Sequence, residues 1–350
     1  MRGHVFVVNE ETLPIHLEYQ FVGVSSGGRD ANIALLADAL RVKENDFIFF
    51  YIEGRNTKKG RFFGVFKAVD NTVYHLTGSS ALAPNLPVKL IYRKKIIPYR
   101  VYQKGVLEWI ALDKLPTYAK ELLWTLIYRK MKAKRGNTML FPWEVERLIS
   151  LIRDENNGQH LSGKHFTFDI TKYEISQGQQ TKNHNIGARV QLSLNDVKNS
   201  ETHLQAYILQ NLSLGNNTFL PEIFGRNIVW IGNEVFAGCG MQKIDILTIE
   251  KLDETEYIYR IIELKHPKSG IGITFAPMQL EYYINWARED IGGHIIGGRK
   301  FNIKPVLLSF TKKFDNIPNS IISQIKSLNR IATAPEIWEI DYNGNTNKVL

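Results

Sequence analysis

Residues 243–265 read KIDILTIEKLDETEYIYRIIELK, and they constrain the fold more than any other stretch of the chain. Two runs rich in isoleucine, leucine and tyrosine flank the polar segment KLDETE, a pattern typical of two antiparallel strands joined by a turn. A hairpin centred near Glu254 places Asp245 and Glu263 opposite one another, with Cβ atoms roughly 5 Å apart. A shift of one residue would turn one of these side chains to the other face of the sheet.

Two facing carboxylates repel, and a divalent cation between them stabilises the pair. Mg²⁺ is commonly held by one or two carboxylates together with phosphate oxygens and water. Glu263 and Lys265 are two apart on one strand, so both side chains point to the same face. A lysine there can orient or help to deprotonate a water molecule and neutralise charge on a phosphoryl group, which suits phosphodiester hydrolysis. The alternative is that Glu263 and Lys265 form a solvated strand end.

Three residues outside the hairpin extend this candidate site. Gln279 and Tyr283 are four apart in APMQLEYYINWA, so they share one face of a predicted helix and both reach toward the strand ends. We expect Gln279 in the catalytic site and Tyr283 on nucleic acid. Glu201 stands near the start of the predicted helix ETHLQAYILQNL, where a carboxylate reaches a metal. The alternatives are an ordinary polar edge for Gln279 and Tyr283, and a helix N-terminus favoured by Glu201.

The residues that carry a family resemblance are, in chain order, Glu201, Asp245 in GMQKIDIL, Glu263 and Lys265 in IIELK, Gln279 and Tyr283. This series resembles the PD-(D/E)XK nuclease superfamily, and within it the NucS-like catalytic domain, over residues 196–310. Ile244 stands where the name-giving pattern has proline.

The resemblance implies a central mixed sheet flanked by helices and Mg²⁺-dependent cleavage of nucleic acid, with Mn²⁺ as another metal. It implies metal ligation by Asp245, Glu263 and the backbone carbonyl of Leu264, with Glu201 as an added acid. It also implies that Lys265 is the catalytic lysine.

The first part of the chain reads as a small, mostly β barrel or strongly curved sheet. Its strand-like runs are VFVV, DFIFFYIEG, GRFFGVFKAV, TVYHL and VKLIYRKKIIPYRVYQKG, interrupted by the helical ANIALLADALRV. The sequence ENDFIFFYIEG followed by GRFFGVFKAV is similar to the PUA-like group of EVE, YTH and ASCH domains, over residues 1–150. That resemblance implies a barrel that holds a flipped or unpaired base, often a modified one, in a pocket.

Two clusters in this first part are candidates for contacting nucleic acid. The segment SSGGRD, with Ser25, Ser26 and Arg29 ahead of a helix, suits a phosphate, although Asp30 as an N-cap in a turn is the alternative. The second cluster follows in YRKMKAKRG and comprises Arg129, Lys130, Lys132, Lys134 and Arg135. A solvated helix end is its alternative. Aromatic residues are plentiful, and the sequence does not say which of them line a base pocket.

The chain divides by pattern into a PUA-like recognition domain at 1–153, a connecting segment at 154–195 and a nuclease domain at 196–350. A helical pair, TYAKELLWTLIYRKMKAKRG and PWEVERLISLIRDENNG, closes the first domain. The connecting segment is polar and contains one strand, FTFDITKYEI. Helices and strands alternate after it, so the predicted fold class is α/β, or α+β overall.

Composition limits the function classes further. Residues 1–150 hold 23 Lys and Arg against 14 Asp and Glu, whereas residues 151–350 hold 21 of each, so the first part is the better candidate for a polyanion. A single cysteine, Cys239, excludes an internal disulfide framework and a thiolate-rich zinc site. Without a long apolar run or a signal peptide, we expect a cytoplasmic protein. No G-x-x-x-x-G-K-[ST] motif indicates a P-loop ATPase.

The sequence therefore predicts a metal-dependent endodeoxyribonuclease, a restriction enzyme whose N-terminal domain reads a base that can be modified. The alternatives are a NucS-like nuclease directed by DNA structure or mismatches, and a non-catalytic nucleic-acid-binding module. The expected partner is double-stranded DNA. A homodimer is plausible because one active site cuts one strand.

Overall fold

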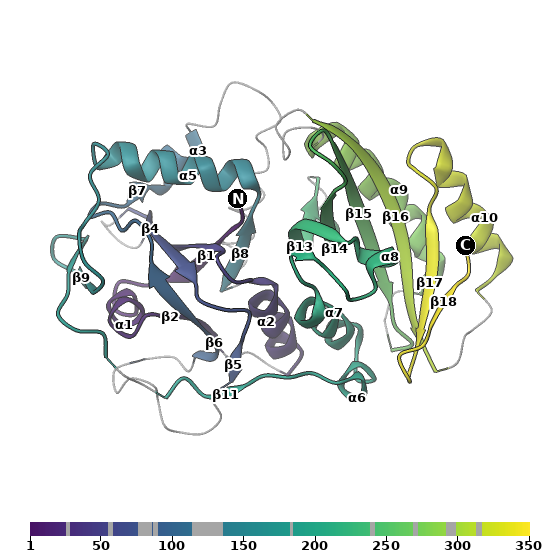
Figure 1. The fold of residues 1–350 in the computed structure, drawn as a ribbon, viewed down its shortest axis with the longest axis horizontal. Helices are drawn as coiled ribbons and strands as arrows, with labels where there is room; N and C mark the ends of the chain where they lie inside the picture. The colour runs from purple at the N-terminus through teal and green to yellow at the C-terminus, as the bar shows by residue number, and fades with distance from the viewer. Residues whose placement is uncertain are drawn as a thin grey trace. The chain divides into compact units, whose positions relative to one another are not determined.

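The computed structural model describes residues 1–25, 29–54, 59–75, 86, 90–113, 136–182, 185–238, 242–268, 272–291, 299–312 and 317–350. The chain divides into two compact units, Met1–Val190 (unit 1) and Gln191–Leu350 (unit 2), and each unit combines helices with one main β-sheet (Figure 1). Most of the predicted connecting segment 154–195 therefore belongs to unit 1. No helix among the described residues is long and apolar enough to cross a membrane.

Unit 1 is built on a nine-stranded sheet. Its strands are β1 (Gly3–Val8), β2 (Phe21–Ser25), β3 (Phe47–Ile52), β4 (Arg61–Ala68), β5 (Tyr74–His75), β6 (Leu90–Pro98), β7 (Val106–Leu107), β8 (Asn137–Leu140) and β11 (Ala188–Arg189). The strand order is β11-β5-β6-β4-β3-β1-β8, with β2 on β6 and β7 on β4. Only the β1–β3 pair is parallel among the described ladders.

The sheet of unit 1 curls because β6 changes partners along its length. Residues 96–98 pair with β4, whereas residues 90–95 pair with β2, and β5 pairs with β6 at Arg93 and Tyr92. The prediction of a strongly curved, mostly β unit is confirmed. The described ladders leave the sheet open between β8 and β11, so they do not form a fully closed barrel.

Four helices are described beside this sheet: α1 (Leu13–Tyr19), α2 (Arg29–Arg41), α3 (Glu108–Asp113) and α5 (Pro142–Glu155). Helix α5 has Pro142 in its first turn, as predicted, and buries Val145, Leu148 and Ile152 against Phe49 and Val65 of the sheet. Alternate residues of the strands therefore pack against the apolar face of α5 in one hydrophobic core. The predicted helix TYAKELLWTLIYRKMKAKRG lies almost wholly outside the described residues.

One predicted strand is a hairpin. FTFDITKYEI forms β9 (Phe166–Asp169) and β10 (Glu174–Gln177), which pair antiparallel. The carboxylate of Asp169 accepts hydrogen bonds from the N–H groups of Thr171 and Lys172, and Tyr173 has a left-handed φ of 61°. A side-chain turn of this kind reverses the chain within an otherwise strand-like run.

Unit 2 contains a seven-stranded mixed sheet in the order β12-β13-β14-β15-β16-β17-β18. Its strands are β12 (Gly215–Asn216), β13 (Asn227–Ala237), β14 (Gln242–Lys251), β15 (Glu256–Lys265), β16 (Lys300–Thr311), β17 (Glu336–Asp341) and β18 (Thr346–Lys348). The β15–β16 and β16–β17 pairs are parallel, and the other described pairs are antiparallel.

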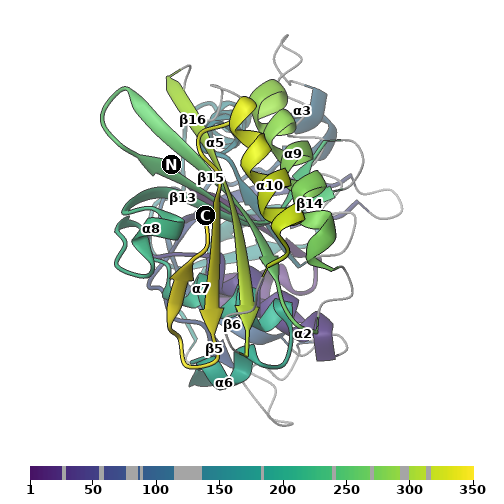
Figure 2. The ribbon, with the colours of Figure 1, turned by 90° about the vertical axis from the view of Figure 1, so that its right-hand side faces the viewer.

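The helices of unit 2 are α6 (Leu194–Val197), α7 (Glu201–Asn211), α8 (Pro221–Phe224), α9 (Ala276–Trp286) and α10 (Asn319–Ser327). Short 3-10 segments occur at Ile273–Phe275 and Leu328–Arg330, and α9 runs into a π-helical segment at Ala287–Ile291. Helices α9 and α10 lie side by side along one face of the sheet (Figure 2).

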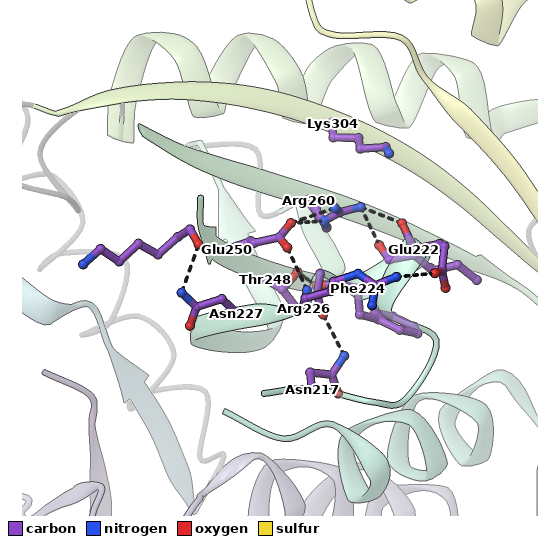
Figure 3. A network of polar contacts seen from close by, with 12 residues as sticks. Asn217, Glu222, Phe224, Arg226, Asn227, Thr248, Glu250, Arg260 and Lys304 are labelled. Atoms are coloured by element: carbon purple, nitrogen blue, oxygen red, sulfur yellow. Dashed lines mark hydrogen bonds and ion pairs between the residues drawn. The ribbon is translucent and has the colours of Figure 1, made fainter. Parts of the chain in front are cut away.

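A buried ion pair fastens α8 to the other face. The guanidinium of Arg260 donates to Glu250 Oε2 through Nε (3.0 Å) and Nη2 (2.7 Å), and through Nη1 to the carbonyl of Glu222 (2.7 Å) (Figure 3). Glu250 Oε1 accepts the N–H of Arg226 at 2.7 Å. The hydroxyl of Thr248 donates to the carbonyl of Phe224. These bonds fix the loop before β13 against the hairpin.

Candidate active site and base pocket

The β14–β15 hairpin sets the geometry of the candidate active site. Its ladder pairs Lys251 with Tyr257 and continues to Ile246 with Ile262, so the centre falls at Glu254 as the sequence predicts. Asp245 and Glu263 lie one residue beyond the last pair of this ladder, Ile246 with Ile262. The turn is tightened by Asp253, whose Oδ1 accepts the N–H groups of Thr255 and Glu256. The predicted centre of the hairpin at Glu254 is confirmed.

The two carboxyl groups occupy different environments. Asp245 Oδ2 accepts the N–H of Leu264 at 2.7 Å. Glu263 is 2% exposed, and its Oε2 accepts no hydrogen bond in the part of the chain that the structure describes. Burial raises the pKa of Asp245 well above its ordinary value, and the charges of Glu263 and Glu201 add to that effect. Burial also raises the pKa of Glu263, although Lys265 opposes this. In this buried site one carboxylate oxygen, Glu263 Oε2, has no hydrogen-bond donor among the described residues.

Lys265 links the strand to α9. Its Nζ donates to Glu263 Oε1 at 2.6 Å and to Gln279 Oε1 at 3.2 Å, and the residue is 5% exposed. An ammonium group has three N–H donors, so two of them are used by the protein. The structure thus brings Glu263, Lys265 and Gln279 together as the sequence predicts.

Glu201 is the first residue of α7, after Ser200, whose hydroxyl accepts the N–H of His203. Its charge raises the pKa values of both Asp245 and Glu263, so its carboxylate lies beside that pair. The start of α7 therefore places a third carboxylate beside Asp245 and Glu263.

Tyr283 has a different place from the one predicted. It is 1% exposed, and its hydroxyl donates to the carbonyl of Lys243 at 2.7 Å. Burial raises its pKa, so the hydroxyl keeps its proton. The side chain ties α9 to β14, and a direct contact with nucleic acid is not consistent with this burial.

The sequence did not indicate the residues that hold the main chain of Asp245 by hydrogen bonds. Gln205 of α7 donates to the carbonyl of Asp245 at 3.0 Å and to Glu234 Oε1 at 3.4 Å, while Asn233 donates to Gln205 Oε1 at 3.1 Å. Glu234 has a left-handed φ of 51°, and its carboxylate forms an ion pair with Lys243. A left-handed glutamate has no sequence signal, because most residues found there are Gly, Asn or Asp.

The donors that converge here fit Mg²⁺. No group of three or more His, Cys, Asp and Glu side chains gathers as a metal site in the described ranges. The N–H of Leu264 points toward β14, and the carbonyl of the same residue points to the same side of a strand. Two carboxylates and a main-chain carbonyl leave positions for water and substrate, which is how Mg²⁺ is usually bound.

Unit 1 contains a cavity of 190 Å³ where β1, β2, β3 and α1 meet. Its polar lining includes Asn9, Thr12, His16 and Glu53, set among apolar residues such as Val8. His16 Nδ1 donates to the carbonyl of Phe21 at 2.9 Å, and burial lowers its pKa to about 4, so the ring is neutral near pH 7. The cavity thus combines apolar surface with fixed polar groups, as sites for small ligands do.

The predicted phosphate contacts of unit 1 lie mostly outside the described residues. Ser25 ends β2 and Arg29 begins α2, but nothing is described of their side chains. Outside the described ranges are Ser26, Arg129, Lys130, Lys132, Lys134 and Arg135. Those contacts remain predictions.

No protein-family model matches the chain, and no curated protein matches it. Among solved structures, a hypothetical protein from Leishmania major is similar over 44% of this chain and 96% of its own, with 10% identity and a TM-score of 0.32. Human THYN1, solved with DNA containing 5-methylcytosine, is similar over 43% of this chain and 97% of its own, with 13% identity and a TM-score of 0.29. Likenesses this distant assign no family to the chain.

Proposed function

We propose that this protein is a Mg²⁺-dependent DNA endonuclease in which unit 2 hydrolyses phosphodiester bonds and unit 1 reads a base, as in a modification-dependent restriction enzyme. One observation carries the proposal. Asp245 and Glu263 face each other at the end of a hairpin, and Lys265 is bound there to Glu263 and Gln279. The PD-(D/E)XK and PUA-like resemblances of the sequence agree with it.

The metal would be held by Asp245, Glu263 and the carbonyl of Leu264, with Glu201 as an added acid, and Mn²⁺ would fit the same donors. When bound, it supplies a Lewis acid for the phosphoryl oxygen and orients the water. The orphaned Oε2 of Glu263 is the atom that most needs such a partner, because a buried acceptor without one costs about 1–3 kcal/mol.

Lys265 has a role that its hydrogen bonds define. Two of its donors are taken by Glu263 and Gln279, which leaves the third N–H for the attacking water or the scissile phosphate. Gln279 accepts from the ammonium and so holds it in one orientation. Preorganised charge of this kind stabilises the negative charge that develops in phosphoryl transfer.

The cavity of unit 1 supports the reading function. A single base extruded from a duplex needs an apolar pocket with hydrogen-bonding groups at its edge, and Asn9, Thr12 and Glu53 provide these. The neutral ring of His16 adds a hydrogen-bond acceptor at Nε2, because Nδ1–H is used by Phe21. The partner would be double-stranded DNA, and cutting both strands would require two copies of the chain or two visits.

Two other functions remain candidates. A NucS-like nuclease directed by DNA structure or mismatches would use the same site and ignore base modification. A non-catalytic nucleic-acid-binding module would have no use for the complete set of Asp245, Glu263 and Lys265, which therefore favours catalysis.

The test is cleavage of matched duplexes that are unmodified, cytosine-methylated or adenine-methylated, with Mg²⁺, by the wild type and by Asp245→Ala. We expect cleavage of one modified class, lost in the variant. Equal cleavage of all three duplexes would contradict base reading by unit 1 and would still support a nuclease. Equal activity of the variant and the wild type would remove the proposed active site.

A further inference from the structure

A row of side chains crosses three strands of unit 1 beyond the core under α5. The ladders pair Phe47 of β3 with Lys67 of β4, and Lys67 with Ile97 of β6. Paired residues share a face of the sheet. Phe47 packs against the edge of the α5 core, whereas Ile97 is 46% exposed. The row therefore runs from the covered part of this face into the uncovered part.

Cations and aromatic rings alternate along the uncovered part. Lys67 Nζ lies 4.3 Å from the centre of the Tyr99 ring and 5.1 Å from that of Phe47, and the guanidinium of Arg100 lies 5.4 Å from Tyr99. Lys95 is two residues before Ile97 and so points to the same face. We call Phe47, Lys67, Lys95, Ile97, Tyr99 and Arg100 the outer strip.

The cations of the outer strip have no acidic partner among the residues that the structure describes. Lys67, Lys95 and Arg100 form no ion pair within the described ranges, in contrast to Arg2, which is bound to Asp46. Unit 1 as a whole holds 28 Lys and Arg against 18 Asp and Glu. Ring contacts hold Lys67 in place, which lowers the entropy cost of binding a further group. Three unpaired cations on one face are complementary to a polyanion.

The outer strip and the cavity lie at opposite ends of the same strands. Phe47 pairs with Gly3 at the start of β1, whereas the cavity is lined by Val7 and Val8 near its end. Four or five residues of strand span about 13–17 Å. The two also lie on opposite faces of the sheet, because His16 of the cavity packs on Phe50, which is three residues from Phe47 on β3 and so points the other way.

We propose that the outer strip binds the phosphodiester backbone of the DNA on a surface separate from the cavity, with Lys67, Lys95 and Arg100 on phosphates and Tyr99 and Ile97 against the sugars. This rests on the proposed reading function of unit 1. It adds a sequence-independent contact that fixes the register of the duplex, because phosphate contacts position a protein and base contacts specify.

The test is binding of a fluorescent 20-base-pair duplex to the full-length protein in EDTA, where no cleavage occurs, at several salt concentrations. The triple variant Lys67→Gln, Lys95→Gln, Arg100→Gln should bind at least about tenfold more weakly. The slope of log affinity against log salt should fall by about 2 to 3, since each phosphate contact contributes about 0.9. Thermal unfolding monitored by circular dichroism checks that the variant is folded.

The matched control is Lys104→Gln, Arg153→Gln, Lys172→Gln, which removes the same charge from exposed cations elsewhere on unit 1. Its affinity should stay within about twofold of the wild type. Equal weakening of binding by both triple variants, or an unchanged salt slope in the first, would overturn the proposal for the outer strip.

Thr12→Tyr, which fills the cavity, separates this proposal from base reading. Loss of the preference for a modified duplex, with a retained salt slope, would support both proposals. If the outer-strip triple variant keeps the wild-type salt slope and the base preference, only the proposal for the outer strip is contradicted.

Discussion

The β14–β15 hairpin carries two buried charge clusters, and they differ in how fully the protein satisfies them. Arg260 and Glu250, on one face, use their hydrogen-bonding atoms on each other, on the carbonyl of Glu222 and on the N–H of Arg226. Asp245, Glu263 and Lys265 lie on the other face, since odd spacing along a strand reverses the side.

The second cluster leaves Glu263 Oε2 without a hydrogen bond, and the carboxyl pKa values are raised. A buried pair that is fully hydrogen-bonded fastens elements together, whereas one left incomplete needs a further ligand. The same hairpin therefore supplies both a structural ion pair, Arg260 with Glu250, and a candidate active site.

The largest expected effect is the loss of cleavage on removing an acid of the incomplete cluster. Asp245→Ala should reduce Mg²⁺-dependent cleavage by about 10³-fold or more, because metal stabilisation of the phosphoryl group is worth several kcal/mol. The same change should alter the unfolding free energy little, because the loss of carboxylate repulsion offsets the loss of the hydrogen bond from the Leu264 N–H. Cleavage rates and urea unfolding measure the two effects. Coupled loss of activity and stability would show that Asp245 is structural.

We call Arg260 and Glu250 the complete cluster, and we expect substitutions in it to lower stability. Arg260→Met should lower the unfolding free energy of unit 2 by about 3–5 kcal/mol, because it leaves Glu250 buried without its cation. Arg260→Met with Glu250→Met should recover most of this loss, since no charge is then left behind. Urea unfolding of the single and double variants measures both the loss of unfolding free energy and its recovery. A single variant as stable as the wild type would mean that water already reaches the pair.

A buried lysine in unit 1 sharpens the comparison because it is less satisfied than either cluster. Lys94 is 1% exposed and its Nζ donates to the carbonyl of Thr72 at 3.2 Å. Burial lowers its pKa to about 8, and burial together with Lys94 lowers that of Lys43 to about 7. The unfolded chain keeps these protons up to about pH 10.4, so unfolding takes up protons above pH 7.

Stability of unit 1 should therefore rise from about pH 7 toward pH 10, by on the order of 1 kcal/mol or more. Lys94→Met should raise stability at pH 7 and flatten the pH dependence. Denaturant midpoints across this range measure both. A midpoint that falls with rising pH in the wild type, or a steeper dependence in Lys94→Met, would contradict the burial of an unpaired amine.

These features were predictable from sequence to different degrees. The register of Asp245 and Glu263 was predictable because KLDETE is a short polar turn between runs of similar length. The strands β17 and β18 were missed, although DYNGN contains the turn residue Gly344 with its left-handed φ of 86°. The support of Asp245 by Gln205 depends on packing between elements 40 residues apart in sequence. Long-range packing leaves no local pattern.

The smallest expected effect concerns the contact between the site and α9. Gln279 accepts from Lys265 at 3.2 Å, so Gln279→Ala frees the ammonium without removing it. Cleavage should slow by about tenfold, which corresponds to about 1.4 kcal/mol, the upper end for one ordinary hydrogen bond. Gln279→Glu should retain more activity than Gln279→Ala, because a carboxylate still accepts from Lys265. Tyr282→Phe, in the next turn of the same helix, is the control for α9 itself. If Gln279→Ala cleaves at the wild-type rate, Glu263 alone orients Lys265, and the incomplete cluster needs only its metal.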